Sequence, residues 1–141
     1  MKLRIKNEDD TRKYGKALAG ELDSGDIVCL TGDLGTGKTA LTKAIAEGLG
    51  IKENIISPTF NIVKEYRSGR LPLYHFDVYR VGSVEEMYDI GVEDYFYGDG
   101  VCVVEWADLI ADIIPEGSRF IEISYGSTPQ ERIYEVGVTE K

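Results

Sequence analysis

Long apolar runs are missing from this 141-residue chain, and none approaches the about 20 residues that a membrane-spanning helix needs. Residues 1–6 lack the apolar core of a secretory signal and read instead as a first strand. We therefore expect a cytoplasmic protein with no membrane association. Sulfur is also scarce: Cys29 and Cys102 form no Cys-x-x-Cys pair, and each lies in an apolar stretch. This pattern argues against a metal site built on thiolates and favours two buried, reduced cysteines.

Positive charge is in short supply too, with 16 lysines and arginines against 25 acidic residues and a net charge of −9. Tight binding to a nucleic-acid backbone needs clustered cations, so the composition argues against direct contact with it. An acidic surface can still steer the chain toward a basic protein partner. A role in RNA metabolism through such a partner therefore remains open.

What the chain does contain is one domain, residues 1–141, without repeats or linkers. Apolar patterning predicts an α/β sandwich of the P-loop type, with a mixed sheet of about seven strands and few helices, concentrated in the first half. A helix carrying Tyr14, Leu18 and Leu22 follows the first strand. Strands are expected over residues 26–30, up to 66, 71–79, 101–104, 119–125 and 131–138, and further helices over 41–49, 84–88 and 107–110.

The most informative segment is residues 32–39, Gly-Asp-Leu-Gly-Thr-Gly-Lys-Thr, which has the full Gly-x-x-x-x-Gly-Lys-[Ser/Thr] pattern of a phosphate-binding loop. An apolar strand precedes it and a helical pattern follows, the context that places phosphates at a helix N-terminus. Lys38 would hold phosphate and act in catalysis, while the Thr39 hydroxyl would ligate Mg²⁺. The residues expected to contact the nucleotide here are Asp33, Leu34, Gly35, Thr36, Gly37, Lys38, Thr39 and Ala40.

Two acidic residues follow apolar strands and are candidates to complete the site. Glu105 comes directly after residues 101–104, and Asp77 ends the strand that carries His75. Because α/β sheets bind ligands at the carboxyl ends of their strands, either carboxylate could serve catalysis, and Glu105 could also help to hold Mg²⁺. Trp106 adjoins Glu105 and fits either the nucleotide site or the core. His75 is more typical of a satisfied strand histidine than of a catalytic one.

Ser57 and Thr59 follow the loop helix, where phosphate-sensing segments of nucleotide hydrolases occur. A hydroxyl there could approach the metal or the terminal phosphate, or it could belong to a polar strand entry.

Taken together, four segments resemble the TsaE (YjeE) family of bacterial ATPases over nearly the whole chain. They are the loop at 32–39, Ser-Pro-Thr-Phe at 57–60, His-Phe-Asp-Val-Tyr-Arg at 75–80 and Val-Glu-Trp at 104–106. The resemblance implies an ATPase required for threonylcarbamoyladenosine in tRNA, acting with TsaD and TsaB and meeting tRNA only through that complex. It also implies that Thr11 lies near the nucleotide and Arg132 near the adenine.

The expected activity is Mg²⁺-dependent ATP hydrolysis, weak in the free chain, which we expect to be a monomer, and raised by partners. Two alternatives remain. A small-molecule kinase shares the loop, but it needs an arginine-bearing lid, whereas the later arginines here are scattered through strands and turns. A nucleotide-gated adaptor would need binding but not hydrolysis.

Overall fold

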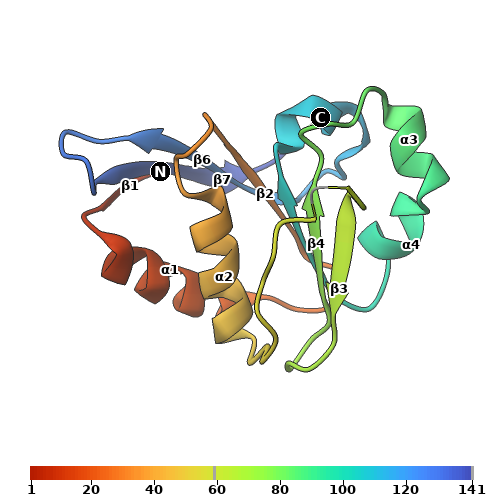
Figure 1. The fold of residues 1–141 in the computed structure, drawn as a ribbon, viewed down its shortest axis with the longest axis horizontal. Coiled ribbons are helices and arrows are strands. Elements are labelled where there is room, and N and C mark those ends of the chain that lie inside the picture. The colour runs from red at the N-terminus through yellow and green to blue at the C-terminus, as the bar shows by residue number, and fades with distance from the viewer. Residues whose placement is uncertain (59, 141) are drawn as a thin grey trace.

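The computed structural model describes residues 1–58 and 60–140 (Figure 1). Within them, a seven-stranded sheet has the order β1-β7-β6-β2-β5-β4-β3. The strands are β1 (Lys2–Ile5), β2 (Ile27–Gly32), β3 (Val63–Tyr66), β4 (Leu73–Asp77), β5 (Val101–Glu105), β6 (Arg119–Tyr125) and β7 (Arg132–Val138). The helices are α1 (Glu8–Glu21), α2 (Lys38–Gly48), α3 (Val84–Asp89), α4 (Val92–Phe96) and the 3₁₀ helix η1 (Ala107–Ile113). The predicted α/β fold with a mixed sheet is confirmed.

The centre of the sheet is parallel and its borders are antiparallel. Strand β2 pairs in parallel with β5 and β6, and β5 pairs in parallel with β4. The hairpin of β3 and β4 adds one antiparallel border, and β6, β7 and β1 form the other. The carboxyl ends of β2, β4 and β5 therefore meet at one edge of the sheet, where the phosphate loop begins.

Helices cover both faces of the sheet and create two apolar cores (Figure 1). Helices α1 and α2 pack on one face, and α3, α4 and η1 pack on the other. Strand β5 contributes to both cores because its side chains alternate: Val101 and Val103 face α2, while Cys102 and Val104 face the opposite core. This alternation explains the uninterrupted apolar run, and it directs Glu105 toward α2.

Two expectations about the rest of the chain had different outcomes. Both cysteines are buried and free, as predicted, and burial raises the pKa of each thiol to about 12. The two longest helices, α1 and α2, do lie in the first half of the chain, but three of the five helices in the described chain follow residue 83, so the expectation holds for helix length and not for helix number. Helix α4 was not predicted, because five residues are too few to show helical periodicity. It forms by burying Val92 and Phe96 in the second core.

Within the described residues, no helix has the length and apolar character to span a bilayer.

Helices α1 and α2 approach closely because glycines lie at their contact. A Cβ added to Gly15 would stand 2.4 Å from the Cβ of Ala44, and one added to Gly48 would stand 2.6 Å from the Cβ of Ala19. Gly20 lies on α1 as well, but nothing lies within 4 Å of its added Cβ. Replacing glycine by alanine on α1 should therefore destabilise the protein at Gly15 and stabilise it at Gly20.

We expect Gly15→Ala to lower the free energy of unfolding by about 1–3 kcal/mol, because α1 must move away from α2. Gly20→Ala is the matched control and should raise it by up to about 1 kcal/mol through helix propensity alone. Urea unfolding of both variants measures the difference. Equal effects at the two positions would contradict the close packing of α1 on α2.

Candidate functional site

The loop between β2 and α2 takes backbone conformations that suit glycine. Gly32 and Gly37 have φ values of 141° and 105°. A Cβ on Gly32 would come within 2.4 Å of the carbonyl oxygen of Ile123, so no larger residue fits there. Gly37 caps α2 without a side-chain hydrogen bond, which leaves the first N–H groups of the helix facing the loop. The loop is therefore shaped to surround an anion with backbone donors.

Lys38 closes this loop from inside. Its buried Nζ donates to the carbonyl oxygens of Gly32 and Asp33, at 2.8 Å each, and lies 4.0 Å from the ring centroid of Trp106. Burial lowers the pKa of Lys38, while the negative charges of nearby carboxylates, Glu105 first among them, act in the opposite direction. The ammonium group is thus held between the loop backbone, an aromatic face and buried negative charge.

Glu105 lies at the centre of a buried polar cluster and is only 2% exposed. Its Oε1 accepts a hydrogen bond from the hydroxyl of Thr39 at 3.0 Å. Its Oε2 lies 2.5 Å from Nε2 of His75 and 3.3 Å from the hydroxyl of Thr42, whose one hydrogen is shared with the carbonyl oxygen of Lys38 at 3.0 Å. Thr39 and Thr42 come from α2, and His75 comes from β4, so the carboxylate joins three elements. A buried carboxylate is tolerated only with such partners.

Asp77 lies beside Glu105, as the two residues are register partners in the parallel pair of β4 and β5. Its Oδ1 accepts a hydrogen bond from the backbone N–H of Tyr79 at 3.1 Å. Asp77 and Glu105 line one cleft of about 330 Å³ together with the phosphate loop. Its other lining residues are Leu34, Gly35, Gly37, Lys38, Thr39, Ala40, Ser57 and Trp106. The structure therefore brings together most of the residues that the sequence nominated.

Trp106 forms the rim of this cleft. It has a left-handed backbone, with φ of 64°, between the end of β5 and the start of η1. Its ring lies against Tyr79, with centroids 4.6 Å apart, as well as over Lys38. A non-glycine residue in this conformation is uncommon and is held only where its surroundings determine it. The side chain lines the cleft and also packs against the second core.

Arg132 and Thr11 are not among the described residues that line the cleft. Arg132 donates from Nε to the carbonyl oxygen of Thr36 at 2.9 Å and borders a cavity of about 520 Å³ beside the first turn of α1. Thr11 is nearly buried on α1, where its hydroxyl lies 3.4 Å from that of Tyr134. It is not among the described residues that line either cavity, so its contact with a nucleotide stays a prediction.

Of the two hydroxyl residues predicted to follow α2 near the phosphates, one is found at the cleft. Ser57 lines the cleft, and its Oγ lies 3.4 Å from the hydroxyl of Thr39. Thr59, the other candidate for a phosphate-sensing role, lies outside the described residues.

Two residues of the site escaped the sequence analysis. Thr42 follows Lys38 by four positions, which places both on one face of α2, and this spacing was a usable signal. Tyr125 is the last residue of β6, and its hydroxyl donates a hydrogen bond of 3.2 Å to the carbonyl oxygen of Leu34 in the loop. No local pattern could connect residues so distant in the sequence.

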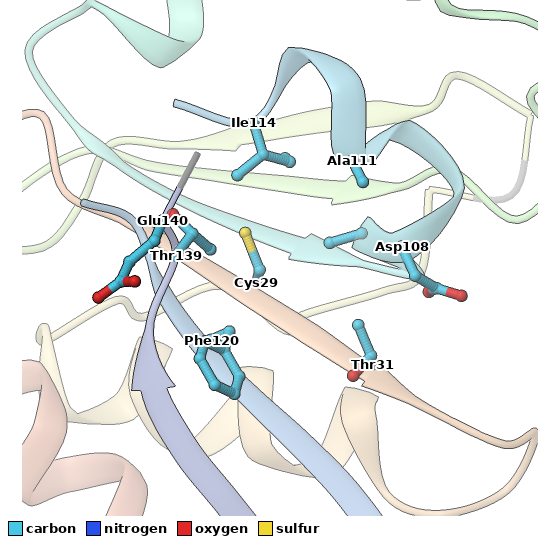
Figure 2. A pocket seen from close by; sticks show the side chains of 9 residues that line it. Cys29, Thr31, Asp108, Ala111, Ile114, Phe120, Thr139 and Glu140 are labelled. Atoms are coloured by element: carbon cyan, nitrogen blue, oxygen red, sulfur yellow. The ribbon is translucent and has the colours of Figure 1, made fainter. Parts of the chain in front are cut away.

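A more apolar cavity lies on the opposite face of the sheet (Figure 2). It measures about 240 Å³ and lies between η1 and strands β2 and β6, with Cys29, Ile114 and Phe120 around it. Asp108 and Glu140 are the charged residues among its described lining, so it offers an anion no positive partner. It is not the phosphate site.

The donors in the first cleft suit a hard metal ion. Thr39 Oγ1, Glu105 Oε1 and Ser57 Oγ are all oxygens, and they lie near one another. The described residues contain no group of three or more His, Cys, Asp or Glu side chains that could hold a metal alone. Mg²⁺ does not require one, because it commonly takes one or two protein ligands together with phosphate oxygens and water. The residues therefore fit Mg²⁺ bound along with a phosphate ligand.

A strand, a glycine loop and a helix carrying Lys38 and Thr39, with an acidic residue ending the neighbouring strand, are the arrangement that defines a P-loop-type fold. Comparison with known proteins gives the family. Residues 5–134 match the model described as "Threonylcarbamoyl adenosine biosynthesis protein TsaE". The chain belongs to the TsaE family.

Relatives named tRNA threonylcarbamoyladenosine biosynthesis protein TsaE support this membership. The Bacillus subtilis protein is 50% identical over 94% of this chain and 83% of its own length. The Treponema pallidum protein is 45% identical over 82% and 85% of the two chains. A crystal structure of Bacillus subtilis YdiB superposes with a TM-score of 0.81 at 42% identity, covering 95% of this chain and 82% of that one.

The contact between Lys38 and Trp106 provides an optical test of the site, because Trp106 is the single tryptophan. A bound polyphosphate should draw the ammonium group from the ring toward the phosphates. We expect a saturable change in tryptophan emission on titration with a nucleoside triphosphate and Mg²⁺. The nucleoside without phosphates is the control and should leave the emission unchanged. An equal change in emission with the triphosphate and with the nucleoside would show that Trp106 does not report phosphate binding.

Proposed function

We propose that this protein binds and hydrolyses ATP with Mg²⁺ as a cytoplasmic component of the machinery that makes threonylcarbamoyladenosine in tRNA. Membership in the TsaE family supports the pathway. The observation that carries the chemistry is the convergence of Lys38, Thr39 and Glu105 at one end of the sheet. The loop backbone and Lys38 bind the phosphate chain, and Thr39 and Glu105 hold the metal, which supplies charge neutralisation at the phosphates.

In this proposal the two acidic residues have separate roles. Glu105, from its buried position, would help to hold the metal and orient the attacking water. Asp77, its register partner on the neighbouring strand, would support the metal from the same cleft. In this proposal the base of the nucleotide occupies the cavity beside the loop that Arg132 and the first turn of α1 border.

The site lacks one contribution that fast phosphoryl transfer needs. Lys38 is the single lysine or arginine among the described residues that line the cleft, and its charge is already engaged with the loop. Charge that develops on the transferred phosphoryl group therefore has little stabilisation from the described residues of the cleft. We infer that hydrolysis is slow in the free protein and faster when a TsaD–TsaB pair docks, with tRNA meeting the complex rather than this acidic chain.

The first prediction from this proposal concerns binding. Lys38→Ala should weaken ATP binding about 100-fold or more, because the loop loses the cation for the phosphates. Lys43→Ala is the matched control, as Lys43 is an exposed residue of the same helix outside the cleft. Equilibrium binding of a fluorescent ATP analogue measures both variants. Equal affinity in the two variants would remove Lys38 from the phosphate site.

The second prediction concerns turnover. Wild-type hydrolysis should be low alone and should rise at least about tenfold with a TsaD–TsaB pair. Glu105→Ala and Glu105→Gln should retain nucleotide but lose about 100-fold or more in turnover, whereas Glu122→Ala, at an exposed strand position, should not.

Phosphate release measured with and without the pair distinguishes the alternatives. No rise despite proven ATP binding would favour the kinase and call for a search for a phosphoryl acceptor. Full tRNA modification with a Glu105 variant that cannot hydrolyse ATP would favour the nucleotide-gated adaptor.

A further inference from the structure

The imidazole of His75 contacts Glu105 but is not among the described residues that line the cleft. It is the single histidine of the chain and is 0% exposed. Its Nε2 lies 2.5 Å from Glu105 Oε2, while its Nδ1 has no hydrogen-bond partner within the described residues. Burying a polar ring with one nitrogen unpaired costs free energy that an apolar side chain of similar size would avoid. The contact of Nε2 with Glu105 should therefore be the reason for a histidine here.

The geometry selects one tautomer of a neutral ring. A carboxylate oxygen accepts hydrogen bonds, so Nε2 must carry the proton that faces Glu105. Nδ1 then carries a lone pair and no hydrogen, which leaves no buried N–H group without an acceptor. The second nitrogen of a histidine commonly sets the tautomer through its own hydrogen bond. Here the single bond to Glu105 does so.

The hydrogen bond from His75 also makes the two oxygens of Glu105 unequal. Oε2 receives His75 and Thr42 on the interior side of the cluster, at 2.5 Å and 3.3 Å. Oε1 receives Thr39, a residue that lines the cleft, at 3.0 Å. Rotation of the carboxylate would break the contacts to Oε2, so the carboxylate plane is fixed.

We propose that His75 is a positioning residue that holds Oε2 of Glu105 and so keeps Oε1 directed toward the metal and water in the cleft. This inference rests on the proposed function of Glu105. His75 does not line the described part of the cleft and acts only through the carboxylate. Outer partners of this kind commonly contribute 10–100-fold to metal affinity or activity, on the order expected here.

A matched pair of substitutions isolates the hydrogen bond. In His75→Gln the amide nitrogen can occupy the place of Nε2, whereas in His75→Asn it falls near Nδ1 and cannot reach Glu105. Both variants bury an amide, so their desolvation costs are similar. His75→Leu keeps an apolar body of comparable size and donates nothing.

We expect His75→Asn and His75→Leu to lose about 10–100-fold in kcat for ATP hydrolysis with little change in ATP affinity. His75→Gln should stay much closer to the wild type. The apparent affinity for Mn²⁺ in the ADP complex, followed by electron paramagnetic resonance, should show the same order. Thermal unfolding of each variant checks that the protein is folded. Equal kcat and equal Mn²⁺ affinity in the Gln and Asn variants would overturn the proposal.

A measurement on the unmodified chain covers the case in which the variants fail to fold. Because there is one histidine, ¹⁵N-labelled histidine gives one pair of ring signals. We expect a protonated Nε2 and an unprotonated Nδ1, and a shift of the Nε2 proton signal in Glu105→Gln. The opposite tautomer would overturn the proposal. Absence of ATP hydrolysis by the wild type under every condition would refute the proposed function, while Mn²⁺ affinity and the tautomer would still decide the role of His75.

Discussion

The site depends on the burial of one carboxylate. Glu105 lies at the end of a strand that is apolar on both faces, where an unpaired charge would be costly. The hydroxyls of Thr39 and Thr42 and Nε2 of His75 lie within hydrogen-bond distance of it. The ammonium group of Lys38 lies near enough for the charge of Glu105 to affect its pKa. The cost of burial is thereby offset by contacts that also fix α2 against β4 and β5. The same contacts set the distance between the phosphate loop and the acidic residues.

The phosphate loop is held by a second set of contacts from elements distant in sequence. Arg132 on β7 and Tyr125 on β6 each bond to a loop carbonyl, and Lys38 bonds to two more from within. The loop is therefore ordered by its surroundings as well as by its glycines. An arrangement prepared in this way lowers the ordering cost of binding a phosphate ligand.

Much of the site was visible in the sequence because its motifs are local. The glycine loop needs particular residues at fixed spacing, and an apolar strand ended by Glu105 shows its own boundary. The alternation of β4 placed His75 and Asp77 on one face, although their environment could not be inferred. Thr42 offered only its helical spacing from Lys38 and Tyr125 offered no local signal, since each acts through a contact formed only when distant parts of the chain come together.

The sequence by itself determined the elements, the phosphate loop and the acidic residues at strand ends, because these follow from periodicity and from steric demands that act over a few residues. Tertiary structure alone decided that β4 neighbours β5, so that His75 meets Glu105, and that Arg132 reaches the loop while Thr11 packs against Tyr134. Tertiary packing also stabilises the short helix α4, which is too short to show a helical pattern in the sequence and forms because its apolar side chains are buried in the second core. The physical reason is that strand order and burial depend on packing between residues far apart in the chain, which no local pattern encodes.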